Sequence, residues 1–304
     1  MFYPDTWSCW EPESLITILK VPQLAEVKIT FYDEKYKRIY DQILWEHVQK
    51  LGERSIDGQY FDLTLKIDQS VFYFEFASCK DMFCARVVPE SPYARYKLLI
   101  GGALRWNTEG TVIFDGERIN IDVKGENFTI KTLNEHDRTA KINISHSGFV
   151  ISLNKPVYIL CNNNWNEQQI LEFLSERRNA CIKEASGSGD AAEELSRAIL
   201  KGMVWNTIYE PTQDRFVTPV TRRWCLMSVM QHFGCYVLFE WDTFFGALLC
   251  AIHNKDFAIR QVESIFEEFR DGCIPLCGSQ VRIRSERSQP PVGSYCILKL
   301  YEQY

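Results

Sequence analysis

The sequence lacks a long apolar run and a leader-like start. No stretch approaches the roughly 18 apolar residues that a membrane span requires. The opening segment Met1-Phe2-Tyr3-Pro4-Asp5 has neither the positive region nor the apolar region of a secretory signal. The sequence therefore predicts a cytoplasmic protein that does not enter the membrane.

Metal-binding motifs and a disulfide framework are also missing. The eleven cysteines are scattered through the chain, and the closest pairs are Cys79/Cys84 and Cys273/Cys277. Neither pair has the C-x2-C spacing or the histidine partners of a zinc site. An odd number of scattered cysteines in a long chain without a signal favours reduced, mostly buried thiols. We expect no metal and no cofactor.

Charge of one sign does not dominate either. Basic residues number 34 and acidic residues 40, which gives a net charge of −6 with both signs interspersed. Without a basic stripe the chain is not expected to bind nucleic acid. With 304 residues, of which 46% are hydrophobic, it is long enough for one large folded domain or two ordinary ones.

From residue 11 to about 161 the sequence shows an apolar period of two. The run from Phe61 to Asp68 alternates without a fault, which places its apolar side chains on one face of a strand. Asp115-Gly116 is a hairpin signal, and the segment Tyr40–Leu51 is either a short helix or an irregular connection. Similar alternating runs occupy 27–31, 71–76, 119–123, 128–130, 141–144 and 157–160. We predict an antiparallel β-sandwich domain over residues 1–161.

Residues 162–304 show helical spacing instead. A capping box is predicted at Asn164–Glu167. The Ser186–Gly189 tract is expected to be a linker or interhelix turn rather than a phosphate loop, because it follows a helix and lacks a Gly-Lys-Ser/Thr ending. The last helix begins at Pro290-Pro291 and reaches Tyr304 without a stop signal, which suggests a fragment. Helices are predicted over 170–181, 195–203, 224–233, 244–252, 258–269 and 290–304.

Aromatic and planar polar residues gather in the connections between these helices. They lie in Trp205-Asn206, Arg222-Arg223-Trp224 and Trp241-Asp242. A sugar offers an apolar face to an indole and hydroxyl pairs to a carboxylate or guanidinium group. The alternative is that Trp205, Trp224 and Trp241 are core residues, as most tryptophans largely are.

These segments, together with Pro219 and Ser288-Gln289-Pro290-Pro291, resemble the opening of the (α/α)6-barrel glycosidases of the trehalase, family 63 and mannosylglycerate hydrolase group. The resemblance implies a β-sandwich followed by an incomplete (α/α)6 toroid. The match departs from the trehalase signature upstream of Phe239, where Phe233-Gly234-Cys235-Tyr236 replaces a glycine-rich lead. The motifs therefore do not identify which sugar is bound.

The resemblance also implies roles for single residues. Asp242 would hold hydroxyls of the sugar in the cleaved subsite, Trp241 would pack beside it, and Gln289 would contact the sugar. The expected substrate-binding set is Trp205, Asn206, Arg223, Trp241, Asp242 and Gln289. The family's catalytic acid lies in a later Gly-Trp-Asp motif and its base later still. Trp241-Asp242 is the only Trp-Asp pair of the chain, so no catalytic residue is assigned.

The length of the chain agrees with the absence of an assigned catalytic residue. A barrel of about twelve helices of roughly 11 residues, plus connections, needs well over 200 residues, whereas residues 163–304 supply 142. We expect the N-terminal portion of an inverting α-glycosidase, which takes an oligosaccharide or glycoside and is inactive alone. A missing C-terminal half or a split partner would complete it. The alternative is a non-catalytic carbohydrate-binding or interaction protein, and the DNA after the codon for Tyr304 would distinguish the two.

Overall fold

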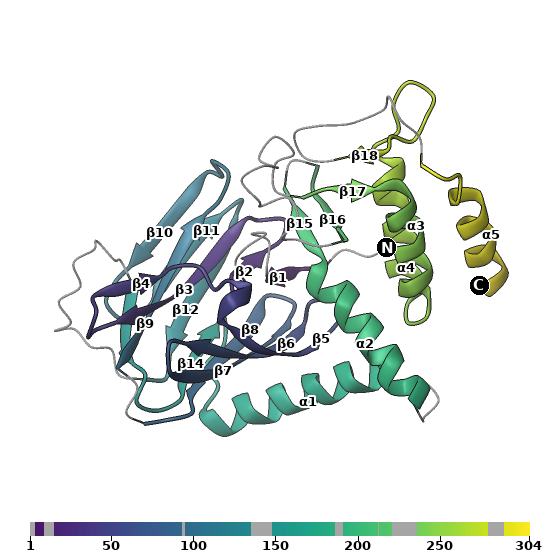
Figure 1. Ribbon diagram of the computed structural model, residues 1–304. Helices are drawn as coiled ribbons and strands as arrows, with labels where there is room; N and C mark the ends of the chain where they lie inside the picture. Colours follow the sequence, from purple (N-terminus) through teal and green to yellow (C-terminus); the bar gives the residue numbers. More distant parts are fainter. Residues whose placement is uncertain are drawn as a thin grey trace. The chain divides into compact units, whose positions relative to one another are not determined.

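The computed structural model describes residues 4–8, 15–92, 95–134, 148–185, 191–211, 213–220, 236–278 and 289–304. The described residues fall into two compact units, one from Pro4 to Cys181 and the other from Ile182 to Tyr304. Figure 1 shows the strands of the first unit in purple to teal and the helices of the second in green to yellow. Each unit is described by itself.

Two antiparallel sheets form the first unit. One has the order β1-β2-β3-β9-β13, with β4 paired to β3, and the other has the order β10-β11-β12-β14-β8-β7-β6-β5. The strands of the first sheet are β1 (Thr6–Ser8), β2 (Ile18–Lys20), β3 (Ala25–Asp33), β4 (Arg38–Tyr40), β9 (Tyr96–Leu104) and β13 (Gly148–Ser152). The strands of the second are β5 (Val48–Arg54), β6 (Tyr60–Ile67), β7 (Ser70–Cys79), β8 (Met82–Pro89), β10 (Gly110–Phe114), β11 (Ile119–Val123), β12 (Glu126–Thr132) and β14 (Val157–Cys161).

Apolar side chains from both sheets meet in the core. The Phe72 ring of the larger sheet lies 5.1 Å from the Phe31 ring and 5.3 Å from the Tyr96 ring of the smaller one. The alternating residues of β6, from Phe61 to Ile67, are buried as predicted. The expected antiparallel strands are confirmed, while the strand predicted at 141–144 lies outside the described residues.

The predicted hairpin at Asp115-Gly116 is also confirmed. Asp115 Oδ1 accepts hydrogen bonds from the amides of Glu117 and Arg118, and Gly116 has a φ of +95°, which favours glycine. The segment Tyr40–Leu51 contains one turn of 3-10 helix, Trp45–His47 (η1), between β4 and β5.

Helix α1 (Glu167–Ala185) covers the outer face of the larger sheet. Ile170, Leu174 and Cys181 pack against a buried cluster on the strands that includes Tyr60 and Leu160. The capping box is shifted from the predicted Asn164–Glu167 to Asn166 and Gln169, whose side chains each accept the other's amide at 3.0 Å. Glu167 instead accepts a hydrogen bond from the Tyr158 hydroxyl. Because α1 packs on the sheet, the first compact unit extends past the change of period at 162.

The described part of the second unit consists of helices, one short hairpin and one further pair of short strands. Its elements are α2 (Ala191–Asn206), β15 (Ile208–Glu210), β16 (Arg215–Val217), β17 (Leu238–Phe239), α3 (Glu240–Ala251), α4 (Lys255–Phe266), β18 (Cys277–Gly278) and α5 (Gly293–Gln303). Strand β15 pairs with β16 and β17 with β18, both antiparallel. Helices α3 and α4 form an antiparallel pair whose turn ends at the N-cap Asn254, which accepts the Phe257 amide.

Several predicted helix limits differ from the structure. The predicted helix over 258–269 ends at Phe266, and Gly272 (φ +84°) instead belongs to a turn with Asp271 (φ 51°). Helix α3 begins at Glu240 rather than Phe244, and α5 begins at Gly293 rather than at the prolines. The predicted helix at 224–233 and the linker at 186–189 lie outside the described residues. In the described part of the chain, no helix combines the length and apolarity that a bilayer crossing needs.

Candidate functional site

The start of α3 brings together residues that are distant in sequence. The N-cap residue Phe239 makes no side-chain capping bond. Instead, the Trp241 amide donates to Gln289 Oε1 at 2.8 Å and the Glu240 amide donates to the Leu276 carbonyl at 3.3 Å. Two of the amides that a helix leaves unpaired in its first turn are therefore satisfied by other segments.

The packing of α5 on α3 positions Gln289, which lies in the segment before α5. A Cβ atom at Gly293 would lie 2.7 Å from Phe244 Cε2, so the absence of a side chain lets α5 approach α3 closely. At the other ends of the two helices, the Gln303 side chain and the Tyr304 hydroxyl both donate to the Ala251 carbonyl. The two helices therefore run parallel, and the segment before α5 meets the first turn of α3.

The first turn of α3 combines an exposed indole with half-buried and buried acids. Trp241 is 40% exposed, while Glu240 is 8% exposed and Asp242 is intermediate. Trp241 begins a row of exposed apolar residues that continues with Phe245, Leu249 and Ile252 along one face of the helix. An indole open to solvent beside a carboxyl group can present an apolar face and a polar contact to the same ligand.

Both acids hold their protons more strongly than usual. Burial raises the pKa of Asp242, and hydrogen bonds with Trp241 and with its own backbone oppose that rise. Burial likewise raises the pKa of Glu240, opposed by a backbone hydrogen bond with Gln289. A helix N-terminus favours the ionised form of an acid, but here desolvation outweighs it. When ionised, Asp242 can accept hydrogen bonds from hydroxyl groups.

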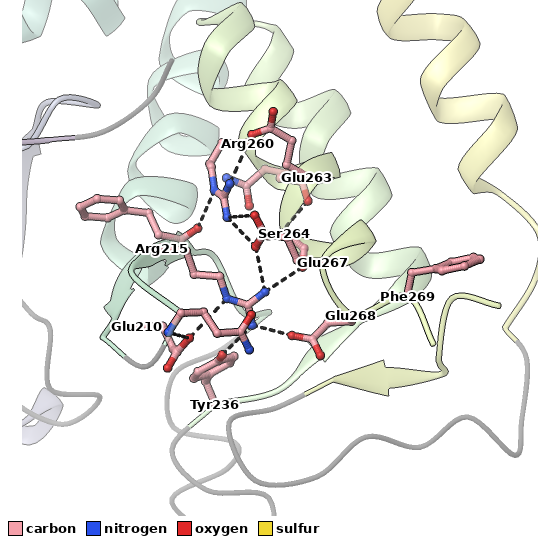
Figure 2. A network of polar contacts seen from close by, with 12 residues as sticks. Glu210, Arg215, Tyr236, Arg260, Glu263, Ser264, Glu267, Glu268 and Phe269 are labelled. Atoms are coloured by element: carbon pink, nitrogen blue, oxygen red, sulfur yellow. Dashed lines mark hydrogen bonds and ion pairs between the residues drawn. The ribbon is translucent and has the colours of Figure 1, made fainter. Parts of the chain in front are cut away.

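A cluster of ion pairs surrounds the buried side chain of Arg215 (Figure 2). The Arg215 guanidinium on β16 pairs with Glu210, Glu267 and Glu268, and it also donates to the Tyr236 hydroxyl at 3.0 Å. Tyr236 directly precedes the short segment that forms β17 and enters α3. The cluster therefore holds the strand that positions the first turn of α3.

The cluster also fixes the partner strand β18. A Cβ atom at Gly278 would lie 2.6 Å from Glu268 Cγ, so glycine is required where β18 crosses this side chain. On the helical side, Arg260 makes two contacts with Glu267 and donates to the Phe216 carbonyl at 3.2 Å. Hydrogen bonds from Arg260 and Arg215 lower the pKa of Glu267 against the opposing effect of burial. These contacts join the hairpin β15–β16 to α4.

The structure brings together only part of the predicted set. Trp241 and Gln289 are hydrogen bonded, with Asp242 next in the chain. Trp205 is 1% exposed and packs in the interior, as in the alternative in which tryptophans are core residues. Asn206 Nδ2 donates to the Gly202 carbonyl at 2.9 Å within its own helix. Arg223 lies outside the described residues.

Two features of the site were not predicted. Glu240 is a buried acid in the same motif as Asp242, and its position before an aromatic residue at a helix start was the available signal. The Arg215 cluster was signalled only by the consecutive acids Glu267 and Glu268, because the hairpin that carries Arg215 was not recognised.

Comparisons with known proteins add little to this geometry. No family model matches the chain, and no curated protein matches it. Among solved structures, one similar chain is "Putative kojibiose phosphorylase from human microbiome", with 10% sequence identity and a TM-score of 0.35. The match covers 100% of this chain and 55% of that one, so this chain spans about half the length of the solved protein. The comparisons assign the chain to no family.

Proposed function

We propose that the first turn of α3 binds the ring of a sugar. The Trp241 indole supplies the apolar face, and the Asp242 carboxylate accepts hydrogen bonds from ring hydroxyls. The Trp241 amide donates to Oε1 of Gln289, because only the oxygen of that side chain can accept a hydrogen bond. The Nε2 group of Gln289 therefore points away from this amide and can act as a donor. The observation that carries the proposal is an indole 40% exposed beside an acid of raised pKa.

The wider proposal is that the chain forms the N-terminal portion of an inverting α-glycosidase. The motif resemblance supports it, and so do the helix directions, because α3 pairs antiparallel with α4 and parallel with α5. Such alternation is expected of a toroid built from an inner and an outer layer of helices. Inverting hydrolysis needs two carboxyl groups about 6.5–9.5 Å apart, one acting as acid and one as base.

A second candidate is a carbohydrate-binding or interaction protein without hydrolytic activity. It is favoured by the contacts of two other carboxylates in the second unit. Glu210 is paired with Arg215, and Asp214 accepts a hydrogen bond from the Tyr209 hydroxyl at 2.6 Å. Neither acid is placed to replace a missing catalytic group.

Apolar faces of the second unit support a helical partner in either case. On α5, Tyr295, Leu298 and Tyr301 are exposed at helical spacing, and Tyr301 is 81% exposed. We propose that further helices cover these faces, supplied by a C-terminal half or by a split partner. Burial of such aromatic side chains would contribute a large part of the association energy.

The sugar proposal is tested by calorimetric titration of the full chain with methyl α-glucoside and methyl α-mannoside. We expect weak binding that Asp242→Ala and Trp241→Ala abolish. The matched control is Asp256→Ala, because Asp256 is an exposed acid in the first turn of α4. Equal affinity in the wild type and Asp242→Ala, or no binding of either sugar, would overturn the proposal.

A further inference from the structure

A row of polar residues crosses the larger sheet beneath α1, in the unit that does not contain the proposed sugar site. Asp62 on β6 is paired in register with Glu75 on β7, Glu75 with Arg86 on β8, and Arg86 with Tyr158 on β14. The next row contains Tyr60, which lies in the cluster that α1 covers. These groups therefore share the face of the sheet that faces α1.

The acids of this row are deeply buried around one phenol. Tyr60 is 1% exposed, Asp62 6% and Glu75 2%. The Tyr60 hydroxyl oxygen lies 2.6 Å from Glu75 Oε1 and 3.0 Å from Asp62 Oδ2. A phenol has one hydrogen to donate, and an ionised carboxylate can only accept. Two ionised carboxylates would leave one of these contacts as two oxygen atoms without a hydrogen between them.

The partners of each acid decide which one carries the extra proton. Glu75 Oε2 lies 2.7 Å from Arg86 Nε, an ion pair that requires the ionised form of Glu75. Asp62 instead has hydrogen-bond contacts with neutral groups, the Tyr60 hydroxyl and the Glu53 amide at 3.3 Å. The arrangement that places a hydrogen atom in both contacts between Tyr60 and the acids runs from Asp62 O–H to Tyr60 and from Tyr60 O–H to the Glu75 carboxylate.

We infer that Asp62 is a neutral carboxylic acid in the folded chain, and that the proton it shares with Tyr60 makes the packing of α1 on the sheet sensitive to pH. Ionisation of Asp62 would place two carboxylates on either side of one phenol beneath α1, where a buried charge without an ion pair is costly. The inference is independent of the proposed sugar site.

The electrostatic surroundings of Asp62 agree with this assignment. Burial raises the pKa of Asp62, and the charge of Glu75 acts in the same direction. The hydrogen bond with Tyr60, the charge of Arg178 on α1 and the Glu53 amide oppose the rise without cancelling it. Among the described residues, the charged or titratable groups that contact or act on Asp62, Tyr60 and Glu75 include Glu53 on β5, Tyr73 on β7, Arg86 on β8 and Arg178 on α1.

The neighbouring strand is shaped to accept this side chain. A Cβ atom at Gly52 on β5 would lie only 1.6 Å from Asp62 Oδ1. Only glycine at this position lets the carboxyl group lie against β5, where it reaches the Glu53 amide. The local backbone therefore holds Asp62 at the distance from Tyr60 that the shared proton requires.

The sign of the pH effect follows from the raised pKa. Stability from protonated Asp62 is fully present below the ordinary aspartate value of 3.8 and is lost as the pH rises through the folded-state pKa. Hydrogen-exchange protection of the β6 and β7 amides should therefore decrease with rising pH in the wild type. In Asp62→Asn, whose amide keeps a donor toward Tyr60, this dependence should disappear.

Exchange of the full chain at neutral pH, followed by mass spectrometry, separates the two acids. Asp62→Asn should keep protection in β6 and β7 close to wild type, whereas Glu75→Gln breaks a buried ion pair and should lower protection by at least about 100-fold. Asp122→Asn is the matched control, an exposed aspartate of the same sheet that accepts a hydrogen bond from Asn127. Protection lost equally in Asp62→Asn and Glu75→Gln would overturn the inference.

Infrared spectroscopy tests the proton directly. The wild type should show a protonated-carboxyl band that Asp62→Asn lacks and Asp122→Asn keeps. If Asp62→Asn does not fold, Tyr60→Phe decides, because loss of the acceptor must shift the frequency of that band. An unchanged band in Tyr60→Phe, or a wild-type band that survives in folded Asp62→Asn, would contradict the assignment.

Discussion

The amide of Trp241 donates a hydrogen bond of 2.8 Å to Gln289 Oε1 across 48 positions of sequence. This contact joins two motifs that only a family resemblance connects at the level of sequence. It depends on the close approach of α5 to α3, which Gly293 permits. The candidate site therefore exists only when the two helices are packed together.

Replacing Gln289 with alanine should weaken both stability and sugar affinity. The substitution removes the acceptor of the Trp241 amide, which should lower the free energy of unfolding by about 1 kcal/mol. Urea denaturation and calorimetric titration measure the two effects. Gln303→Ala is the control, because it removes the bond to the Ala251 carbonyl at the far end of α5. It should cost similar stability while leaving sugar affinity unchanged.

Two glycine substitutions should have opposite signs. Gly293→Ala places a methyl group 2.7 Å from Phe244 Cε2 and should destabilise the chain by about 1–3 kcal/mol. Gly202→Ala adds a methyl group inside α2 with nothing within 4 Å and should stabilise it by about 0.5–1 kcal/mol. Thermal denaturation checks both. Equal effects of the two variants would show that α5 does not pack on α3 as described.

Removal of Arg215 should be far more damaging than removal of Arg260. Arg215→Ala leaves the buried carboxylates of Glu210 and Glu268 without their cation, at a cost of about 3–5 kcal/mol. The partners of Arg260, Glu263 and Glu267, are partly exposed, so Arg260→Ala should cost about 1 kcal/mol. Denaturant unfolding of both variants gives the comparison. A cost for Arg215→Ala no larger than that for Arg260→Ala would mean that the cluster does not hold the hairpin.

Sugar binding should weaken on acidification. Asp242 accepts hydroxyl hydrogen bonds only when ionised, so affinity should fall as the pH drops through its raised pKa, above the ordinary value of 3.8. The stability effect has the opposite sign, since the contribution of protonated Asp242 is lost as the pH rises through that pKa. Titrations over a pH series test this for the wild type and Asp242→Asn. An equally pH-dependent affinity in Asp242→Asn would assign the effect to another group.

The 304-residue chain should hydrolyse no α-glucoside or α-mannoside. General acid and general base assistance are each worth roughly 10²–10⁴-fold. The Gly-Trp-Asp motif that carries the acid in the glycosidases the sequence resembles does not occur in these residues. Aryl α-glucosides, trehalose, kojibiose and mannosylglycerate are the substrates to assay. The exposed side chains of α5 also predict self-association, which light scattering would detect. Robust turnover by the monomer would contradict the proposal, together with the structural roles given above to Glu210 and Asp214. Glu210, Asp214 and Glu286 would then be the first acids to substitute.

Local sequence patterns determined much of the secondary structure. The alternation from Phe61 to Ile67 and the turn at Asp115-Gly116 were predictable because strand periodicity and turn chemistry act within a few residues. The same alternation places Asp62 on the face opposite these apolar side chains, and packing of α1 buries that face as well. A period of two cannot reveal whether a helix covers the second face of a sheet.

The same distinction between local sequence and tertiary packing applies to the candidate site. The sequence by itself determined which residue types lie together at the start of α3, because Glu240, Trp241 and Asp242 are consecutive. It did not determine that Trp205 is buried while Trp241 is exposed, or that Gln289 completes the first turn of α3. Only the tertiary structure decided these points, because burial and long-range hydrogen bonds depend on how segments distant in the chain pack against one another.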